Sequence, residues 1–166
     1  MSFNVVAILG IVKEDEILLI KRDKFPFTGL WGLLGGKVES GESIDATAIR
    51  EVVEETGLDA NFHSFGGSVK EHVMEDGEIV TNLLLLVCRM TPKSSELKSN
   101  YEGELGWFKI SELDDMKDKI IPNDLHMLNK MILNDTDKNF KSVIEKNGDN
   151  YRLLEFAVND YERREG

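Results

Sequence analysis

The chain has only one cysteine, Cys88, and three prolines among its 166 residues. One thiol cannot form an intramolecular disulfide, so the fold must be held by its packed core, and we expect a reducing, cytoplasmic setting. A chain of this length can bury such a core without disulfides or structural metals. We therefore expect a single domain over residues 1–166.

Long apolar runs and clustered positive charge are also missing. No apolar run approaches the roughly 20 residues that span a bilayer, and no basic segment precedes the first apolar run as in a signal peptide. Lys and Arg number 20 against 31 Asp and Glu, a formal net charge of -11. Neither a membrane nor a nucleic acid is therefore an expected partner. A small anionic ligand fits if a divalent cation mediates the contact.

Hydrophobic patterning predicts an α/β fold with a mixed sheet and helices packed on it. Ser43 is a good N-cap and Gly57 a good helix stop, so one helix is predicted between them. The dipeptides Asp76-Gly77 and Asn147-Gly148 predict hairpin turns. Loops are predicted over 23–30 and 91–102. Strands are predicted over 3–12, 17–22, 61–74, 78–90 and 105–110. A strand that passes into a tight turn is predicted over 31–39, and a C-terminal helix and hairpin over 122–158.

The predicted helix carries an acidic face. Glu51, Glu54 and Glu55 stand at i, i+3 and i+4 and therefore lie on one side. We expect the other side to pack on the sheet through residues 48, 49, 52 and 53. The common interpretation of such a cluster is a solvated acidic surface. Like charges at these spacings cost about 0.2–0.5 kcal/mol per pair, and the helix dipole disfavours anions in the C-terminal half. A bound divalent cation would offset both terms.

The residues before the helix decide between these interpretations. The segment GGKVESGE allows a tight turn with exposed backbone atoms. From Gly36 to Leu58 the order is Gly36, five residues, Glu42, seven residues, then REVxEExGL, Arg50 to Leu58. This order fills every defining position of the Nudix box, and the chain resembles the Nudix hydrolases. The resemblance implies an α/β/α sandwich with a central mixed β-sheet.

The resemblance also implies roles for the box residues. Glu51, Glu54, Glu55 and the carbonyl of Gly35 are expected to bind Mg²⁺ or Mn²⁺. Arg50 is expected to orient a glutamate, and Glu42 to brace the loop against the helix.

The family's general base is either a box glutamate, such as Glu54, or an acidic residue on a later loop. The later candidates here are Glu102 and Glu104, of which we favour Glu104. The residues expected to contact the substrate phosphates are Lys37, Arg22 and Gly36.

Family members hydrolyse a nucleoside diphosphate linked to a group X. The stretches LLIKRDKFPFTGLWGLLGGKVESGE and EGELGWFKISEL, followed by IIPNDLHML, look like the MutT-type enzymes that hydrolyse oxidised purine triphosphates. In the human-type members an acidic pair after proline reads the purine edge, and Asn123 and Asp124 match its place. Asn123 replaces one acid, and Gly32 replaces an asparagine that contacts the base. Trp31 is a candidate for stacking on the base. For all three candidates ordinary structural roles, helix capping or core packing, are open.

These observations rank three functions. The first is a Mg²⁺-dependent pyrophosphohydrolase for nucleoside triphosphates, such as 8-oxo-dGTP, releasing the monophosphate and pyrophosphate. The second keeps the box and changes the substrate to ADP-ribose, a dinucleoside polyphosphate, a nucleotide sugar or an RNA cap. The third is a nucleotide-sensing module without catalysis, which usually lacks box carboxylates. The expected partner is a small nucleotide, and a homodimer is an assembly that family members often form.

Overall fold

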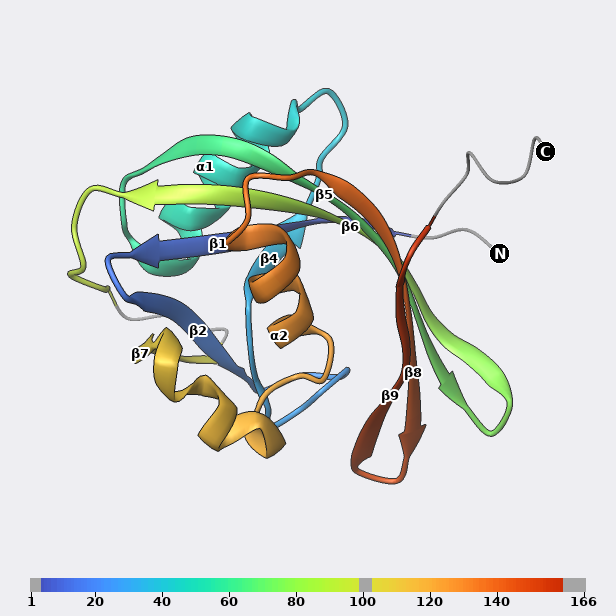
Figure 1. Cartoon of the computed structure of the whole chain (residues 1–166). Helices are drawn as coiled ribbons and strands as arrows, with labels where there is room; N and C mark the ends of the chain where they lie inside the picture. The colour runs from blue at the N-terminus through green and yellow to red at the C-terminus, as the bar shows by residue number, and fades with distance from the viewer. Residues whose placement is uncertain (1–3, 99–102, 160–166) are drawn as a thin grey trace.

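The structure, a computed structural model, describes residues 4–98 and 103–159. In these two ranges nine strands form one mixed, curved β-sheet (Figure 1). The long hairpin of β5 and β6 lies near its centre and continues beyond the helices. The strands are β1 Asn4–Lys13, β2 Glu16–Arg22, β3 Trp31–Gly32, β4 Leu34–Lys37, β5 Ala60–Glu75, β6 Glu78–Pro92, β7 Gly103–Lys109, β8 Lys138–Asn147 and β9 Asn150–Val158.

Strand β1 is shared between neighbours, and this sharing creates the site. On one side it runs parallel to β6 over its length. On the other side it pairs with β2 only at Val12 and Lys13, while β4 pairs with residues 6–9 of β1. The strand order is β3-β2-β1-β6-β5-β8-β9, with β7 paired to β2. Strand β4 therefore pairs with the middle of β1, where β2 has diverged from β1 and no longer pairs with it.

Two helical segments cover opposite faces of the sheet. Helix α1 (Ile44–Thr56) packs Ala48 and Val52 against Ala7 and Leu9 of β1. The other face of β1 carries Ile8, which belongs to a core with helix α2 (Asp124–Met127) and the π-helical turn Leu128–Ile132 that continues it. Adjacent residues of a strand point to opposite faces, so β1 separates the two cores. The expected α/β/α arrangement is confirmed (Figure 1).

The predicted ends of the box helix are confirmed, and its predicted packing face is confirmed at Ala48 and Val52 only. Ser43 accepts a hydrogen bond from the Ala46 amide, and Gly57 ends the helix in the left-handed conformation with φ +74°. Ile49 and Val53, expected to pack on the sheet, are 40% and 45% exposed. The buried face runs instead through residues 47, 48, 52, 55 and 56. Compared with the predicted face, the buried face is rotated about the helix axis and includes Glu55, whose side chain therefore faces inward.

Other predictions are confirmed with small shifts. Asp76-Gly77 is the turn between β5 and β6, since Glu75 pairs with Glu78. The last hairpin turns at Gly148-Asp149, one residue later than predicted.

The 3₁₀ segment Ile110–Lys119 was not predicted. Its sequence is mostly polar, and short 3₁₀ turns leave no 3.6-residue apolar period to detect.

A buried arginine connects the π-helical turn to the sheet. Arg89 of β6 donates its Nε to the Met131 carbonyl at 2.8 Å and an Nη to the Thr136 carbonyl at 2.6 Å. Its other Nη donates to Ser64 and Phe65 of β5. These bonds satisfy carbonyl groups at the end of a helix, where intrahelical partners run out. Arg89 thereby fixes the end of the segment that begins with Asp124.

Candidate active site

The residues of the box form one ionic network around Arg50. Its Nε and one Nη donate to the two oxygens of Glu42, both at 2.8 Å. The other Nη donates to Glu51 at 2.9 Å and Glu54 at 3.0 Å. The paired guanidinium lowers the pKa of Glu42 to about 2. Arg50 thus holds three box glutamates, and Glu42 also bridges the preceding loop to the helix by accepting hydrogen bonds from Thr47 and Glu39. The expected roles of these residues in catalysis stay predictions.

The carboxyl group of Glu51 lies against Gly36, and it can keep this position only while residue 36 has no side chain. A Cβ built on Gly36 would overlap the carboxyl carbon of Glu51. The backbone of β4 and the acidic face of α1 are thus in direct contact. This contact has a sequence signature in the glycine pair, but only the fold shows which glutamate it accommodates.

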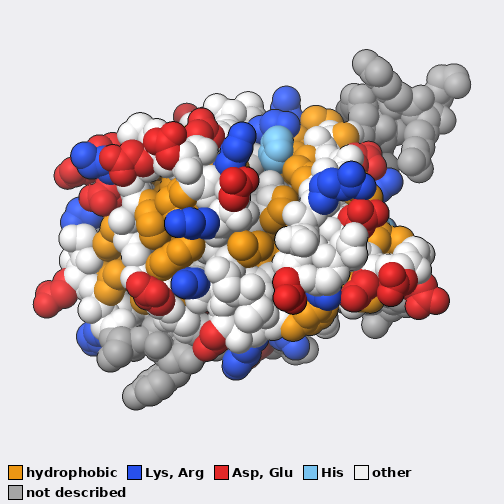
Figure 2. Space-filling view, turned by 90° about the horizontal axis from the view of Figure 1, so that it is seen from below, with side chains coloured by type: hydrophobic (Ala, Val, Ile, Leu, Met, Phe, Trp, Pro, Cys, Tyr) orange, Lys and Arg blue, Asp and Glu red, His pale blue; other side chains and the backbone are white. Residues whose placement is uncertain are grey.

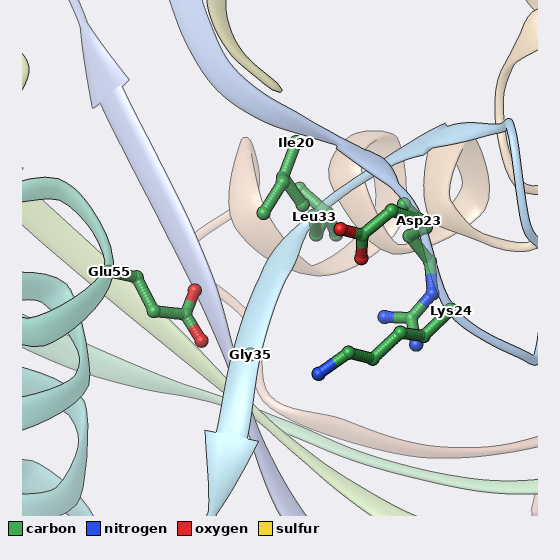
Figure 3. A pocket seen from close by; sticks show the side chains of 7 residues that line it. Ile20, Asp23, Lys24, Leu33, Gly35 and Glu55 are labelled. Atoms are coloured by element: carbon green, nitrogen blue, oxygen red, sulfur yellow. The ribbon is translucent and has the colours of Figure 1, made fainter. Parts of the chain in front are cut away.

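A small cleft of about 120 Å³ opens between α1 and β4. Figure 3 shows Glu55 from α1 on one side of Gly35 and Lys24, from the loop after β2, on the other. The carboxylate and the ammonium group both point into the space between them. Arg22 and Asp23 also line this cleft. A ligand here would meet acids from the helix and bases from the loop.

The donor atoms of this cleft suit a hard divalent cation. Glu51, Glu54 and Glu55 offer carboxylate oxygens and Gly35 a carbonyl, the ligand types that Mg²⁺ and Mn²⁺ prefer. Gly35 and Glu55 line the same cleft, and Glu51 lies on the neighbouring glycine. Within the described residues, however, no three acidic, histidine or cysteine side chains already converge tightly enough to enclose an ion. Arg50 occupies one oxygen each of Glu51 and Glu54 instead.

A second, larger cavity of about 240 Å³ continues from this cleft on the other side of β4. Arg22, Leu33 and Gly35 line both spaces. Near the box the larger cavity is lined by Gly36 and Lys37, and elsewhere its walls are mostly apolar. The walls come from β1, β6, α2 and the loop after β2, through Val6, Ile8, Leu83, Leu85, Met127 and Phe27.

Two buried acids also line this cavity. Glu71 of β5 accepts a short hydrogen bond from the Asn123 side-chain amide. Asp124 of α2 accepts one from the Leu33 backbone N–H at 2.8 Å. Burial raises the pKa of Glu71 to about 7. Burial, and then the nearby charge of Glu71, raise the pKa of Asp124 to about 8, while its bond from Leu33 and the charge of Arg22 act in the opposite direction.

The bond from Leu33 explains why Asp124 is not a helix cap. Neither Asn123 nor Asp124 caps α2, since its N-cap makes no side-chain hydrogen bond. Gly32 leaves the room for Asp124, because a Cβ there would come within 2.7 Å of Oδ2 and still closer to Ile121. The subgroup asparagine at position 32 could not be accommodated in this arrangement.

The C-terminal hairpin positions one wall of the cavity. The hydroxyl of Tyr151, in β9, accepts the Phe27 backbone N–H at 3.1 Å. The two rings lie 4.6 Å apart. Phe27 has φ +65°, a conformation that non-glycine residues rarely adopt. Arg22 secures the same loop by donating its Nε to the Pro26 carbonyl at 2.8 Å.

The structure brings most of the predicted substrate-binding residues to the two spaces. The residues that line them are Arg22, Gly36, Lys37 and Asp124. Asn123 is hydrogen-bonded to Glu71, which also lines the larger cavity. Their contacts with substrate stay predictions.

Trp31 and the later acids are placed differently. Trp31 packs edge-on against Phe108, with ring centroids 4.8 Å apart, and is not among the cavity-lining residues. Glu104 pairs with Lys21, on the face of β2 opposite to Ile20 and Arg22, which line the cleft. Glu102 lies outside the described residues. A role for Glu104 at the cleft therefore finds no support in this geometry.

Three residues at the site escaped the sequence analysis. Lys24 lies in a loop whose folding back could not be foreseen. Tyr151 is distant in sequence from Phe27. Glu71 did leave a signal, because Val69, Glu71 and Val73 alternate with exposed positions. An acid at an inward position of a strand is unusual and marks a candidate functional residue.

On the face drawn in Figure 2, Asp and Glu side chains are most frequent at the upper left edge. Lys and Arg side chains are scattered over this face among Asp and Glu, with apolar side chains between them. None of the helices in the described ranges is long and apolar enough to cross a membrane.

Comparison with known proteins identifies the family. The model described as the NUDIX domain matches residues 1–131, and the chain therefore belongs to the Nudix family, as the box predicts. The crystal structure of a MutT protein from Bacillus halodurans is similar with a TM-score of 0.72 and 26% sequence identity, over 95% of this chain and 98% of that one. The match to the family ends before β8, so one domain over residues 1–166 stays a prediction.

Curated relatives match over shorter stretches. An ADP-ribose pyrophosphatase of Methanocaldococcus jannaschii is 52% identical over 54 residues, 32% of each chain. A Bacillus subtilis protein provisionally named an 8-oxo-dGTP diphosphatase is 48% identical over 48 residues, 29% of this chain and 30% of that one. The chain thus spans about a third of these relatives' length. Their names agree with the expected enzyme class, a Nudix hydrolase, and differ in substrate.

Proposed function

We propose that the protein is a divalent-metal-dependent pyrophosphohydrolase that cleaves a nucleoside diphosphate linked to X. The first candidate substrates are purine nucleoside triphosphates, including oxidised ones such as 8-oxo-dGTP, with release of the monophosphate and pyrophosphate. The observation that carries this proposal is the position of the complete box. Its acidic helix face lies against the glycines of β4, at the junction of a small charged cleft and a larger apolar cavity.

The metal ligands in this proposal are Glu51, Glu54, Glu55 and the Gly35 carbonyl, with Mg²⁺ as the expected ion. Nudix enzymes generally use divalent metal ions. When bound, such an ion neutralises phosphate charge and acidifies a water. The net charge of -11 opposes the approach of a polyphosphate, and a bound ion would offset this repulsion at the box.

The side chains supply the remaining requirements. Arg22, Lys24 and Lys37 surround the two spaces and can hold the phosphate oxygens by charge-assisted hydrogen bonds. Arg50 holds the carboxylates of Glu51 and Glu54 in place. Glu54, whose side chain is 57% exposed, is the candidate to accept the proton of the attacking water at its carboxylate. Glu104 is the less favoured base because it lies on the other face of β2.

The lining of the larger cavity favours a nucleotide. Its apolar walls can enclose a flat ring, while its buried acids offer specific hydrogen-bond partners. Arg22 and Lys37, the basic residues that line this cavity, lie at its side nearer to the box. A substrate with a base in the cavity would thus present its phosphates to the acidic helix.

The test is a substrate panel in the presence of Mg²⁺. We would compare kcat/KM for 8-oxo-dGTP, dGTP, ADP-ribose and a dinucleoside polyphosphate, with chelated metal as the blank. We expect the triphosphates to be cleaved best and activity to vanish with a chelator. A preference for ADP-ribose over every triphosphate would favour the second candidate, which the Methanocaldococcus relative's name supports.

Two box variants test the catalytic assignment. Glu54→Gln and Glu55→Gln keep the side-chain shape but remove the charge, and we expect losses of about 10²–10³-fold in kcat. Asp45→Asn, in the first turn of the same helix, is the matched control and should keep full activity. Circular dichroism would establish that all three variants are folded. Full turnover in either glutamine variant would contradict the proposal, and nucleotide binding without cleavage by the wild type would instead indicate a sensor.

A further inference from the structure

Besides Asp124 of α2, the cavity is lined by a second acid, Glu71, which comes from a strand. The residue before Asp124 in the chain is Asn123. Its side-chain amide donates to Glu71, so an acid from β5 lies beside the acid from α2. Glu71 and Asp124 both line the cavity, although 53 positions separate them in the chain. The two elements thus contribute one carboxyl group each to one wall.

Both acids are held in fixed orientations. Glu71 is 3% exposed and sits between the fully buried Val69 and Val73 on the inner face of β5. One of its oxygens accepts the Asn123 amide, and one oxygen of Asp124 accepts the Leu33 N–H. In the described part of the chain no salt bridge involves either acid. Arg22, which acts electrostatically on both, donates its Nε to Pro26.

Burying two neighbouring acids without an ion pair opposes folding. A leucine at position 71 would pack between Val69 and Val73 without this cost. A hydrogen bond that only links β5 to α2 would not require a carboxyl group. Groups arranged against stability in a cavity are candidates for ligand recognition. A purely structural tie is the competing explanation, and ligand preference separates the two.

We propose that Glu71 is a specificity-determining residue which, with Asp124, reads a nucleobase edge carrying two adjacent N–H donors, as guanine does, while Asn123 positions Glu71. This inference rests on the proposed function in taking the ligand to be a nucleotide. Two carboxyl groups from separate elements present neighbouring acceptors. The guanine edge offers N1–H next to the 2-amino group, whereas inosine lacks the amino group and adenine lacks N1–H.

The apolar walls complete this assignment. Leu83 and Leu85 of β6 and Ile8 of β1 line the same cavity as the acids, so a planar base has apolar surfaces to lie on. Lys37 and Arg22 lie at the side nearer to the box. A base bound at Glu71 would therefore extend its phosphates toward Gly35.

The test measures binding of GMP, IMP and AMP by calorimetry without metal, so that hydrolysis plays no part. We expect the wild type to bind GMP about tenfold more tightly than IMP or AMP, as a good pair of base-edge hydrogen bonds allows. In Glu71→Gln the amide oxygen can still accept from Asn123, which turns an N–H donor toward the base. The preference should then fall to about twofold or less. Glu75→Gln, the same change farther along β5, is the control that keeps the preference.

A second variant protects the test against misfolding. In Asp124→Asn the side-chain oxygen can still accept the Leu33 N–H, and the amide again faces the base as a donor, so we expect the same loss of preference. Equal binding of the three nucleotides by the wild type, no binding at all, or an unchanged preference in folded Glu71→Gln or Asp124→Asn would overturn the inference. A GMP preference without hydrolysis of any panel substrate would overturn the proposed function alone. Hydrolysis without the preference would overturn the inference alone.

Discussion

The two ends of the site use the same chemical group in opposite environments. At the box, Glu42, Glu51 and Glu54 surround Arg50, and the pKa of Glu42 falls to about 2. In the cavity, Glu71 and Asp124 are buried without an ion pair, and their pKa values rise to about 7 and 8. The Glu42 carboxyl group at the first end therefore stays ionised at neutral pH. The carboxyl groups at the second end exchange protons near neutral pH.

This difference follows from solvation and counter-charge. A carboxylate beside a guanidinium keeps its charge, and a buried one loses the hydration that stabilises that charge. Ionised acids suit a metal ion, while buried, directionally held acids suit hydrogen bonds to an uncharged ring. We therefore expect phosphate chemistry at the first end and base recognition at the second.

Among changes that do not substitute the acids themselves, the largest expected effect is at Gly36. Gly36→Ala would push Glu51 away from β4, and displacement of a catalytic group by about 1 Å can lower the rate about 100-fold. We expect the loss in kcat. Gly41→Asn is the control, because Gly41 also lies in the box, a Cβ there would meet no atom within 4 Å, and asparagine tolerates its φ of +84°. Equal kcat for Gly36→Ala and wild type would show that the position of Glu51 does not matter.

At the other end, Gly32→Ala should affect binding instead. The added methyl group would crowd Ile121 and Asp124, so we expect KM to rise about tenfold for a purine triphosphate while kcat changes little. Steady-state kinetics on both glycine variants measure the contrast directly. If Gly32→Ala lowered kcat as strongly as Gly36→Ala does, the two ends would not be functionally separate.

A smaller effect is expected from Tyr151. Tyr151→Phe keeps the ring contact with Phe27 and removes the acceptor for its N–H. We expect a loss of about 1 kcal/mol in the free energy of unfolding, with a modest rise in KM. Tyr151→Leu removes the ring contact as well and should lose more. Urea unfolding of the pair separates the two contributions, and identical stability of wild type and both variants would exclude a supporting role for the hairpin.

The last expected effect is a pH dependence of stability. The folded pKa values of Glu71 and Asp124 lie above their ordinary values of 4.5 and 3.8, so the folded state binds more protons between these limits. Stability should therefore fall as pH rises toward about 8. Glu42 has a lowered pKa, and its contribution should be lost below about pH 4.5. Thermal unfolding at pH 6 and 8 should show a smaller decrease in Glu71→Gln than in wild type, and an equal decrease would contradict the assignment.

The sequence predicted the box end of the site well. Local signals sufficed there: Ser43 and Gly57 bound the helix, and the i, i+3, i+4 spacing put three glutamates on one side. The paired interaction of Arg50 with Glu54, one turn apart, follows from the same geometry. The packing of Ile49 and Val53 was wrong, because the rotation of a helix on a sheet depends on the sheet.

The cavity end was predicted only in part. Asp124 was a candidate from its place in the chain, but its acceptance of the Leu33 N–H joins two distant segments. Glu71 was visible only as an acid in an inward position. Neither its bond to Asn123 nor its approach to Asp124 could be read locally.

The sequence by itself determined the chemistry of the box, since a helix places residues on one face by its own period. Only the tertiary structure decided what the box faces. The divergence of β2 from β1 opened the space beside β4, and packing of β5 against α2 brought two acids 53 positions apart into one cavity. Contacts of this kind depend on strand pairing over long separations, for which no local pattern exists.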